Sequence, residues 1–490
     1  MLVGREHERA ILQEALVTDH SELIVVHGRR RIGKTFLIRS AFEGRMSFEL
    51  SGMHRGTLKQ QLKNFHLRFP VKGRPQLPPA DWIEGFELLG RFLDRTRGKV
   101  SKGKRRSVKA PKQVVFIDEF PWLDGHRSGF LAAFSNFWNS YATKRRDLVV
   151  VICGSAASYM IRHVVNNKGG LHNRLTRSIR LEPFNLHETE LLLKSRKVSL
   201  TRYDITQLYM ALGGVPHYLQ MVKRGESVAQ AIDRLCFDQH GFLRGEFSNV
   251  FASLFDNPGN HEAVVRTLAK VRKGLTRNAI LQLSGLASGG TLSKTLRELQ
   301  ESGFIEQYTP YDGKKDPLHR ITDEFIQFYL RFAEGRKPAR PGHWAKIMGT
   351  PAYKAWSGFT FETLCMKHVD QVKHALGISG VRSSEGSWIG KGDESGAQID
   401  LLIDRDDNVI NLCEMKFAAG PFTVDKKYAR ELATKVEVFR FSTRTRKSIF
   451  LTFVTTHGLV QNAYSRQLVQ NEVALEALFE GDQLQPNMSY

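Results

Sequence analysis

Short hydrophobic runs alternate with amphipathic segments over the first 185 residues of the chain. The runs Leu23–Val26, Val114–Ile117 and Leu148–Ile152 are continuous, which is typical of strands that are buried on both faces of a parallel sheet. The segments between them have the apolar spacing of amphipathic helices. This alternation predicts an α/β domain with a parallel sheet over residues 1–185.

The pattern changes after residue 185, and the length of the chain suggests about three domains. Helical spacing dominates the next stretch, whereas β-rich and helical runs alternate again from Pro351 onward. We therefore predict five further segments: a helical lid at 186–255, a winged-helix domain at 256–335, a linker at 336–350, a second α/β domain at 351–478 and a polar tail at 479–490.

The winged-helix prediction rests on three helical runs that are followed by two short strands. Glu262–Lys270, Arg277–Leu283 and Thr291–Ser302 have helical apolar spacing. A turn signal at Tyr311–Lys314 separates the two strands. Three helices and a wing resemble a winged helix–turn–helix.

The whole chain carries a strong positive charge, with 72 Lys and Arg against 50 Asp and Glu and a formal net charge of +22. This excess predicts polyanionic partners, of which nucleic acid, with DNA favoured, is the first candidate. Lys294 and Arg297, outward residues of the third predicted helix, would then meet a DNA major groove. The alternatives are a basic surface that serves solubility alone, and a winged helix that packs on the predicted α/β domain of residues 1–185 and touches no DNA.

One segment, Arg91–Lys112, concentrates ten Lys or Arg residues and a single acid, Asp94. A flexible basic arm that contacts the phosphates of nucleic acid would have this composition. A solvated loop would have it equally well, so both interpretations stay open.

Cysteine usage and the absence of long apolar runs indicate the compartment. Four cysteines lie far apart, and no pair has the spacing of a metal site, which is typical of free thiols in a reducing compartment. The stretch Met1–Ala10 lacks the apolar core of a signal peptide, and no hydrophobic run is long enough to span a bilayer. We expect a soluble cytoplasmic protein without membrane contact.

A glycine-rich loop follows the first predicted strand and precedes a predicted helix, Thr35–Phe42. Glycines let backbone N–H groups approach phosphate oxygens, and the N-terminus of the helix adds positive potential. The lysine of such a loop serves the β- and γ-phosphates, and the hydroxyl that follows binds Mg²⁺. The residues of this Walker A pattern, all assigned to ATP binding, are Gly28, Arg29, Arg30, Arg31, Ile32, Gly33, Lys34 and Thr35.

The second predicted strand ends in two carboxylates, Asp118 and Glu119. Asp118, with Thr35, would hold the magnesium ion directly or through water, and Glu119 would polarise the attacking water as a general base. The third predicted strand runs into Ser155, which would sense the γ-phosphate or, alternatively, cap the helix that follows. ATP and Mg²⁺ are therefore the predicted cofactors.

Five motifs occur in a fixed order: Gly4-Arg5-Glu6, the Walker A loop, Ile117-Asp118-Glu119-Phe120, Cys153-Gly154-Ser155 and Gly214-Val215-Pro216. They resemble the archaeal-type ATPase family within the STAND branch of AAA-like P-loop proteins, over about residues 1–330. The resemblance implies that Pro216 contacts the nucleotide and couples it to the arrangement of the domains. A helix–helix turn would suit the same residues. By analogy Arg174 or Arg177 could act as an arginine finger, a role that the sequence alone does not assign.

Two β-rich runs near the C-terminus flank a turn at 406–408 that is rich in Asp and Asn. If these three residues form the loop, a common length for hairpins, Asp400 falls opposite Glu414. Lys416 is two residues further along and shares that face. Two carboxylates and a lysine then converge on strands that look central, where a carboxylate needs a partner such as a metal ion.

The pattern Asp400…Glu414-x-Lys416 resembles the PD-(D/E)xK restriction-endonuclease-like superfamily, over about residues 351–460. The resemblance implies that Asp400 and Glu414 hold a magnesium ion and that Lys416 positions or activates the attacking water. Glu362, on an earlier predicted helix, matches the acidic residue often found on the first helix of that fold. In the ATPase family named above, such a domain is a recurrent C-terminal fusion.

The predicted fold is therefore α/β: a P-loop NTPase parallel sheet with a helical lid and winged helix, followed by a second α/β nuclease-like domain. The predicted function is that of an ATP-binding and ATP-hydrolysing, ATP-regulated nuclease that acts on DNA with Mg²⁺. The alternative is a nucleotide-dependent switch or DNA-binding regulator whose nuclease-like domain binds but does not cut. A third interpretation is an ATPase scaffold for a protein partner, and a homo-oligomer is also left open.

Overall fold

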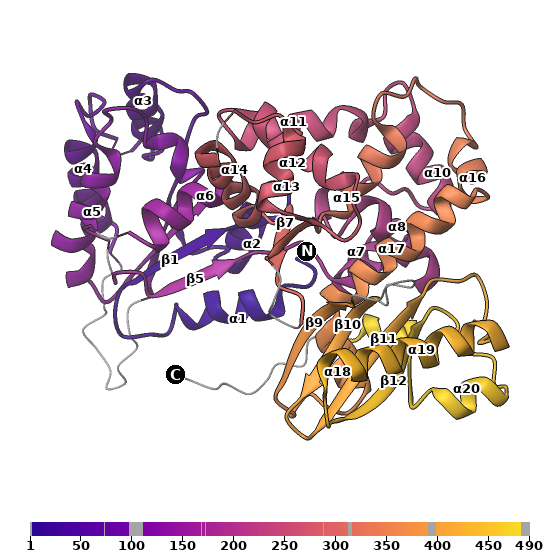
Figure 1. The fold of residues 1–490 in the computed structure, drawn as a ribbon. Coiled ribbons are helices and arrows are strands. Elements are labelled where there is room, and N and C mark those ends of the chain that lie inside the picture. The colour runs from indigo at the N-terminus through magenta and orange to yellow at the C-terminus, as the bar shows by residue number, and fades with distance from the viewer. Residues whose placement is uncertain are drawn as a thin grey trace. The chain divides into compact units, whose positions relative to one another are not determined.

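The structure is a computed structural model of the 490-residue chain, and it describes residues 2–72, 74–97, 111–167, 169–171, 173–287, 289–311, 316–390 and 398–481. The chain divides into two compact units, Met1–Glu182 and Pro183–Tyr490. Figure 1 shows the helices and strands of both units. The boundary lies three residues before the end predicted for the first domain.

The first unit is built on a five-stranded sheet with the order β2-β3-β4-β1-β5. Every neighbouring pair is parallel, which confirms the predicted parallel α/β architecture. The hydrophobic runs identify the three central strands but miss the two edge strands, β2 and β5, whose residues are less completely buried. The strands are β1 (Glu22–His27), β2 (Met46–Ser51), β3 (Gln113–Asp118), β4 (Leu148–Gly154) and β5 (Arg177–Arg180).

Helices cover both faces of this sheet (Figure 1). Ile24 packs into one hydrophobic core and its neighbour Val25 into the other, because successive residues of a strand point to opposite faces. Burial on both faces explains the continuous apolar runs. The helices are α1 (Glu6–Glu14) and α2 (Lys34–Ala41) on the side of Ile24, α3 (Leu58–Leu67), α4 (Trp82–Arg95) and α5 (Phe130–Ser140) on the side of Val25, and the short α6 (Ala157–Tyr159).

The second unit begins with a helical region, which includes residues 186–255; that these residues form a separate lid domain stays a prediction. Its α8 is buried along most of its length and packs against α7 and α15. The helices are α7 (Leu186–Ser195), α8 (Arg202–Leu212), α9 (Pro216–Leu219), α10 (Val228–Ile232) and α11 (Glu246–Leu254), with α15 (Glu324–Phe328) contributed from further along the chain.

Three helices and a small antiparallel sheet of order β6-β8-β7 follow, in the order that the sequence predicts for a winged helix. The apolar face of α14 buries Leu292, Leu296 and Leu299, as its spacing indicates. Of the predicted turn at Tyr311–Lys314, all but the first residue lies outside the described residues. The elements are α12 (Pro258–Ala269), β6 (Leu275–Thr276), α13 (Arg277–Ser284), α14 (Gly289–Glu301), β7 (Ile305–Tyr308) and β8 (Leu318–Ile321).

Residues 336–350, predicted as a linker, are instead packed against the helical region and include α16 (His343–Met348). Asp233 accepts hydrogen bonds from Gly342 N at 2.7 Å and from Trp344 N at 2.8 Å. Trp344 is buried against the ring of Trp356. The prolines and glycines of this segment suggest a flexible chain, but a buried tryptophan and a carboxylate that satisfies two backbone N–H groups hold it in place.

A second five-stranded sheet, of order β13-β12-β11-β10-β9, forms the core of the C-terminal part. β9, β10 and β11 are antiparallel neighbours, whereas β11, β12 and β13 are parallel. Neither strand of the predicted hairpin is an edge strand, as their apolar side chains indicate. The elements are β9 (Ser383–Ile389), β10 (Gln398–Arg405), β11 (Val409–Lys416), β12 (Ser448–Thr455), β13 (Asn471–Ala474), α17 (Pro351–Lys367), α18 (Val369–Ala375), α19 (Lys426–Thr443) and α20 (Ala463–Leu468).

The segment 479–490, predicted as a polar tail, begins within the fold. Phe479 is buried, and its carbonyl oxygen lies 3.1 Å from Nδ1 of His187. Residues 482–490 lie outside the described residues, so the tail prediction is not tested for them.

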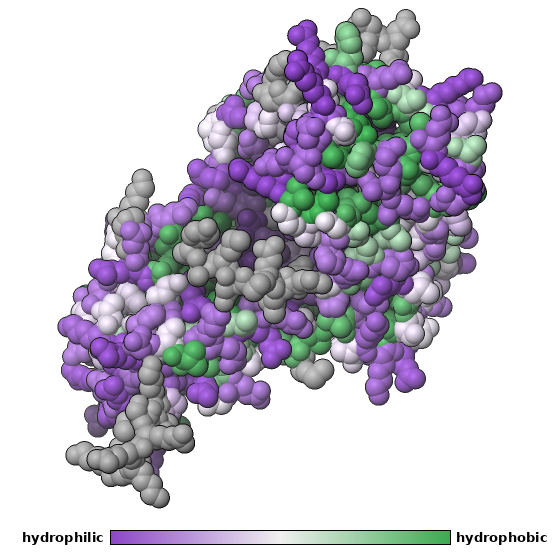
Figure 2. Space-filling model, turned by 90° about the horizontal axis from the view of Figure 1, so that it is seen from below, coloured by the Kyte–Doolittle hydropathy of each residue, from purple (hydrophilic) through white to green (hydrophobic). Residues whose placement is uncertain are grey.

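Among the helices that the structure describes, none is both long and apolar enough to cross a bilayer. The face of the molecule in Figure 2 is predominantly hydrophilic, and its hydrophobic side chains form scattered patches. Charged residues, 25% of the chain, are rarely fully buried and therefore contribute to this hydrophilic surface.

Candidate functional site

The Walker A loop is shaped by two glycines. At Gly28 (φ +141°) a Cβ atom would lie 2.3 Å from Leu181 O, so only glycine fits against the chain that follows β5. Gly33 (φ +90°) precedes the first residue of α2. No side chain caps α2, and the first N–H groups of a helix without such a cap form a site for phosphate.

The residues between these glycines have different environments. Ile32 belongs to the hydrophobic core on the side of α1 and α2, so its contribution to a bound phosphate is limited to its backbone. Arg29 is buried, whereas Arg30 and Arg31 are partly exposed. Arg31 has a positive φ of 70°, which helps to curl the loop toward α2.

Lys34 lies inside the loop, where backbone oxygens hold its ammonium group. Nζ donates to Gly28 O at 2.9 Å and to Arg29 O at 2.7 Å. Burial lowers the pKa of Lys34, and the negative groups nearby act in the opposite direction. A triphosphate supplies the dense negative charge that compensates a buried ammonium group.

The two predicted magnesium ligands of this site meet. Thr35 Oγ1 donates a hydrogen bond to Asp118 Oδ2 at 2.8 Å. Asp118 ends β3, and its other oxygen accepts a hydrogen bond from Glu119 N at 2.9 Å. A hydroxyl and a carboxylate are oxygen donors of the kind that Mg²⁺ prefers, so these residues fit a Mg²⁺–ATP complex.

Glu119 and Ser155 are hydrogen-bonded at the carboxyl ends of neighbouring strands. Ser155 Oγ lies 2.8 Å from Oε2 of Glu119, and Ser155 N donates to the same oxygen at 3.3 Å. Because β4 lies between β1 and β3, the residue after β4 lies between the P-loop and the carboxylates of β3. Ala156 precedes α6, and no side chain caps that helix, so Ser155 is not its cap.

Arg177 is unsuited to act as an arginine finger in its own chain's site. It is the first residue of β5, and its guanidinium pairs with Glu14 at 2.9 Å and with Glu22 at 3.6 Å. β5 runs parallel to β1, so its first residue lies at the edge of the sheet opposite to the P-loop. Arg174 lies in the turn that leads into β5.

The motif Gly214-Val215-Pro216 joins two helices of the second unit. Pro216 is the first residue of α9, and Gly213 (φ +67°) ends α8. A Cβ atom at Gly214 would lie 1.8 Å from Phe184 O, so the turn is tightly packed. The helix–helix turn is therefore present, and the contact of Pro216 with a nucleotide stays a prediction.

The basic stretch between α4 and β3 is anchored at both ends. Arg97 pairs with Asp147 at 2.9 Å, and Lys112 Nζ donates to His20 O at 2.6 Å. Residues 98–110, which hold six of the ten basic residues, lie outside the described residues. The predicted nucleic-acid arm concerns those residues and stays a prediction.

In the second unit, the C-terminal hairpin has the register that its loop length predicts. β10 and β11 are joined by the three residues 406–408. Leu401 pairs with Cys413, so the next residues outward, Asp400 and Glu414, face each other across the two strands. The turn chemistry alone thus places the two carboxylates together.

Glu414 is surrounded by polar partners although it is only 8% exposed. Lys416 Nζ lies 3.4 Å from its Oε2, Tyr428 OH donates to the same oxygen at 2.8 Å, and Lys435 Nζ forms an ion pair with Oε1. Burial alone would raise the pKa of Glu414, but the two lysines and the tyrosine lower it below its usual value. The carboxylate is therefore ionised and fixed in position.

The other two predicted carboxylates have raised pKa values. Burial, and then the charges of Asp400 and Glu414, raise the pKa of Glu362 to about 8, although Lys416 acts against them. Burial, followed among the raising effects by the charge of Glu414, also raises the pKa of Asp400. Such mutual effects require carboxylates that lie close together in a region of low polarity.

Glu362 is brought to the hairpin by α17, which packs against β10 and β11. The ring of Phe361, beside Glu362, lies 5.5 Å from the ring of Phe417, the residue after Lys416. The structure thus brings the predicted residue of the first helix into the neighbourhood of the hairpin residues.

Among the described residues, no group of three or more His, Cys, Asp or Glu side chains lies close enough together to hold a metal ion. Asp400 and Glu414 still offer oxygen donors on facing strands. Burial and, to a smaller extent, the charge of Glu414 raise the pKa of Asp400, and a divalent cation would offset both effects. The donor set fits Mg²⁺, provided that Lys435 moves away from Glu414 when the ion binds.

Two residues of this site, Tyr428 and Lys435, are not among those that the sequence predicts. Both lie on α19, whose buried side includes Leu432 and Phe439. Helical spacing places Lys435 on that apolar side, three residues after Leu432 and four before Phe439. A lysine on the apolar face of a helix signals a buried anionic partner, and the sequence contains this signal.

The predicted DNA-contacting residues Lys294 and Arg297 are exposed on α14. At the other end of this domain, Tyr311 OH donates to Asp404 Oδ2 at 2.7 Å and Tyr311 N donates to Ser387 O at 2.8 Å. This part of the chain therefore contacts the second sheet, whereas packing of the winged helix on the ATPase core of residues 1–185, the alternative to DNA binding, stays a prediction. Contact with DNA stays a prediction.

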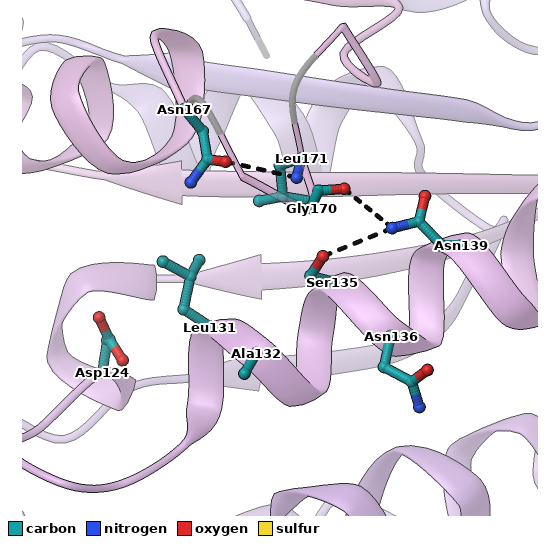
Figure 3. Close-up of a pocket in the computed structure, with 9 residues that line it drawn as sticks. All are labelled: Asp124, Leu131, Ala132, Ser135, Asn136, Asn139, Asn167, Gly170 and Leu171. Atoms are coloured by element: carbon teal, nitrogen blue, oxygen red, sulfur yellow. Dashed lines mark hydrogen bonds between the residues drawn. The ribbon is translucent and has the colours of Figure 1, made fainter.

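A cavity of about 650 Å³ opens beside α5 in the first unit. In Figure 3, the side chain of Asn139 connects α5 to the loop at Gly170: its Nδ2 donates a hydrogen bond to Gly170 O at 2.8 Å. A Cβ atom at Gly170 would lie 1.9 Å from Ser135 Oγ, so the loop is pressed against the helix. Asp124 in the lining accepts a hydrogen bond from Tyr159 OH at 2.5 Å. No predicted site residue lines this cavity.

Residues 2–222 match the family ATPase_2, described as an ATPase domain predominantly from Archaea. Together with the parallel five-stranded sheet and the loop between β1 and α2, this match identifies the N-terminal part of the chain as a P-loop ATPase domain. The match covers the first unit and the first helices of the second, and it ends before the C-terminal sheet.

The chain is also similar to individual proteins. The uncharacterized protein MJECL04 of Methanocaldococcus jannaschii is 26% identical over 442 residues, which are 89% of this chain and 92% of the relative. The Walker-type ATPase PABY2304 of Pyrococcus abyssi matches 68% of this chain and 96% of its own, at 18% identity and a TM-score of 0.49. The ORC2 protein of Aeropyrum pernix matches 67% of this chain and 92% of its own, at 13% identity and a TM-score of 0.41.

Proposed function

We propose that this protein is an ATP-controlled nuclease that acts on DNA. The proposal rests mainly on one cluster: Glu362, Asp400 and Glu414 gather beside Lys416 closely enough for their charges to shift one another's pKa values. Buried carboxylates that repel one another destabilise a fold. A site that takes up a divalent cation and a phosphodiester gives such a cluster a function.

The ATPase domain supplies the controlling half of this function. Thr35 and Asp118 would hold the Mg²⁺ of bound Mg²⁺–ATP, an ion that neutralises charge on the phosphates, while Lys34 would contact the β- and γ-phosphates. Glu119, whose carboxylate is oriented by Ser155, would take the proton of the attacking water. Ser155, which is hydrogen-bonded to Glu119, would then sense the γ-phosphate.

The hairpin supplies the cutting half. Asp400 and Glu414 would hold a Mg²⁺ ion, which when bound polarises the scissile phosphate, and Glu362 would lie near them on α17. Lys416, held beside Glu414, would orient the attacking water and stabilise negative charge that develops on the phosphate. Lys435 keeps Glu414 ionised and fixed until the metal ion binds.

A single helix connects this site with the turn that is predicted to contact ATP. Tyr203, in the first turn of α8, stacks on Phe417 with ring centroids 5.0 Å apart and planes 7° apart, and Phe417 follows Lys416. The other end of α8 runs into the Gly213–Pro216 turn. A nucleotide that moves this turn would therefore shift α8 and, through Tyr203, the end of β11.

A second candidate function is a nucleotide-dependent switch or DNA-binding regulator whose nuclease-like domain binds but does not cut. The contacts of Glu414 favour this second function, because both of its carboxylate oxygens already have cationic or hydroxyl partners. In that case Lys416 and Lys435 take the place of a metal ion permanently. A scaffold for a protein partner, or a homo-oligomer, would be compatible with the same ATPase domain.

Cleavage of supercoiled plasmid and of single-stranded circular DNA, with Mg²⁺ or with EDTA, tests the proposal. We expect cleavage only with Mg²⁺, and a rate at least about 100-fold lower in Glu414→Gln and in Lys416→Ala. Asp406→Asn, on the exposed hairpin loop, is the matched control and should cut at the parental rate. Tight DNA binding without cleavage at any Mg²⁺ concentration would support the second candidate and contradict the first.

A further inference from the structure

A strip of positive charge follows the outer face of α19 and the turn after it. Between Lys426 and Lys447 the chain has eight Lys or Arg residues and two Glu residues. Six of the basic residues are exposed and, within the described part of the chain, make no ion pair or side-chain hydrogen bond; they are Lys426, Lys427, Arg430, Arg440, Arg444 and Arg446. Cations without partners on one surface are available to a polyanion.

Phe441 lies among these charges. Its side chain is 86% exposed, more than any other large hydrophobic side chain in the described ranges. The buried side of α19, with Leu432 and Phe439, packs on the second sheet, so Phe441 points away from the core. A single exposed ring is ordinary on a protein surface, but a ring bordered by unpaired arginines is the combination that binds single-stranded nucleic acid.

Helical spacing aligns Lys427 and Arg430 with Phe441 along one stripe of α19, whereas Arg440 borders this stripe and Arg444 and Arg446 follow the end of the helix. Lys427 and Arg430 precede Phe441 by fourteen and eleven residues, close to whole numbers of helical turns, and the stripe is about 21 Å long. Glu437 interrupts the positive charge on the same side. The stripe is long enough for a strand of several nucleotides, with Phe441 near its end.

We propose that the outer face of α19 and the turn after it bind single-stranded DNA, with the basic residues on phosphates and Phe441 stacked on a base. A duplex would not fit this description, because its bases are stacked on one another and offer no face to the ring. The choice of DNA rests on the proposed function. The inner face of the same helix carries Lys435, the partner of Glu414, so the strand would be held by the helix that borders the cleavage site.

Fluorescence anisotropy with the full-length protein and a labelled 20-nucleotide oligo(dT), in EDTA to prevent cleavage, tests this inference. We expect Phe441→Ala to bind about tenfold more weakly and Phe441→Trp to bind as the parent does. The triple variant Arg440→Ala, Arg444→Ala, Arg446→Ala should also bind at least about tenfold more weakly, and the slope of log affinity against log salt should fall by about 2. The control triple Arg55→Ala, Lys59→Ala, Lys63→Ala removes the same charge from exposed positions of the first unit and should bind as the parent does.

Parental binding by Phe441→Ala or by the arginine triple would overturn the inference. Three other results would also overturn it. They are equal affinity for a duplex of the same length, tighter binding of oligo(U) than of oligo(dT), and displacement of the oligonucleotide by polyglutamate that is as effective as displacement by DNA, which would indicate an acidic protein partner. The proposed function and this inference can be contradicted separately. If the protein binds single-stranded DNA through α19 but never cuts it, the nuclease function is wrong. If the protein cuts DNA while both variants bind as the parent does, the inference about α19 is wrong.

Discussion

Thr35 Oγ1 and Asp118 Oδ2 are hydrogen-bonded at 2.8 Å, although 83 residues separate them in the chain. The bond joins the first turn of α2 to the carboxyl end of β3. The fold thus already brings together the two groups that we propose hold the Mg²⁺ of bound ATP, so the proposed site would need little rearrangement within the first unit. Substitutions in this site should therefore change ATP chemistry more than they change the fold.

Lys34→Ala tests the phosphate-binding role of the P-loop. We expect ATP to bind at least about tenfold more weakly, because the variant loses charge-assisted hydrogen bonds to the phosphates. Titration with a fluorescent ATP analogue measures the affinity, and Lys59→Ala, an exposed lysine on α3, should bind as the parent does. Parental affinity in Lys34→Ala would show that the P-loop does not hold the nucleotide.

Glu119→Gln separates ATP binding from hydrolysis. The amide keeps the shape of the carboxylate and a hydrogen bond to Ser155, but it is a poor proton acceptor. We expect near-parental ATP affinity with phosphate release about 100-fold slower or more. If the variant releases phosphate at the parental rate, Glu119 is not the general base.

The sequence predicts the facing positions of Asp400 and Glu414 better than the residues that surround them. A loop of three residues fixes the register, and the register places Asp400 opposite Glu414, so local turn chemistry is sufficient. Lys435 reaches Glu414 from α19, and that contact depends on how a helix packs across a sheet. Neither turn chemistry nor strand periodicity carries that information, although a lysine on an apolar helix face hints at it.

Lys435→Met tests whether this lysine stands in for a metal ion. The variant keeps much of the side-chain volume but leaves Oε1 of Glu414 without its cation. In EDTA the protein should lose about 1–3 kcal/mol of stability, because a buried carboxylate loses a charged partner. The Mg²⁺ concentration for half-maximal cleavage should fall about threefold or more, because the ion no longer competes with an ammonium group.

Thermal unfolding in EDTA and a Mg²⁺ titration of cleavage measure the two effects of Lys435→Met. Lys354→Met, an exposed lysine on α17, is the control and should change neither quantity. An increased Mg²⁺ requirement in Lys435→Met would mean that the lysine supports the metal site instead of competing with it.

His368 predicts a pH dependence of stability in the second unit. Leu186 N donates to its Nε2 at 3.0 Å, and its Nδ1 lies 2.8 Å from Leu364 O, so the proton of the neutral ring is on Nδ1. Burial lowers the pKa of His368 to about 4. In the unfolded chain the pKa of His368 is near 6.5, so its imidazole binds a proton between pH 6.5 and pH 4, whereas the buried imidazole of the folded chain does not. Protonation therefore stabilises the unfolded state: the contribution of His368 to folding stability is fully present above pH 6.5 and is lost as the pH falls toward 4.

Through His368 the second unit should lose about 2 kcal/mol of unfolding free energy between pH 7.5 and pH 5. Urea unfolding at the two pH values measures the loss, and His368→Gln should show a loss that is smaller by this amount. His126→Gln, an exposed histidine, should keep the parental difference. An identical pH difference in the parent and in His368→Gln would contradict the assignment.

The segment 336–350 shows why composition misleads about linkers. Its prolines and glycines are typical of a flexible chain. What holds it is Asp233, more than a hundred residues earlier, which accepts hydrogen bonds from Gly342 N and Trp344 N. Hydrogen bonds from a residue so distant in the sequence cannot be predicted from the local sequence, although a tryptophan in a polar stretch suggests burial.

The rate of DNA cleavage with and without ATP tests most directly the claim that the first unit controls the second. In single-turnover reactions with saturating Mg²⁺, we expect ATP to change the parental rate by about fivefold or more. Lys34→Ala should cut at the nucleotide-free rate whether or not ATP is present. A parental rate that does not respond to ATP, or a response that persists in Lys34→Ala, would contradict the account.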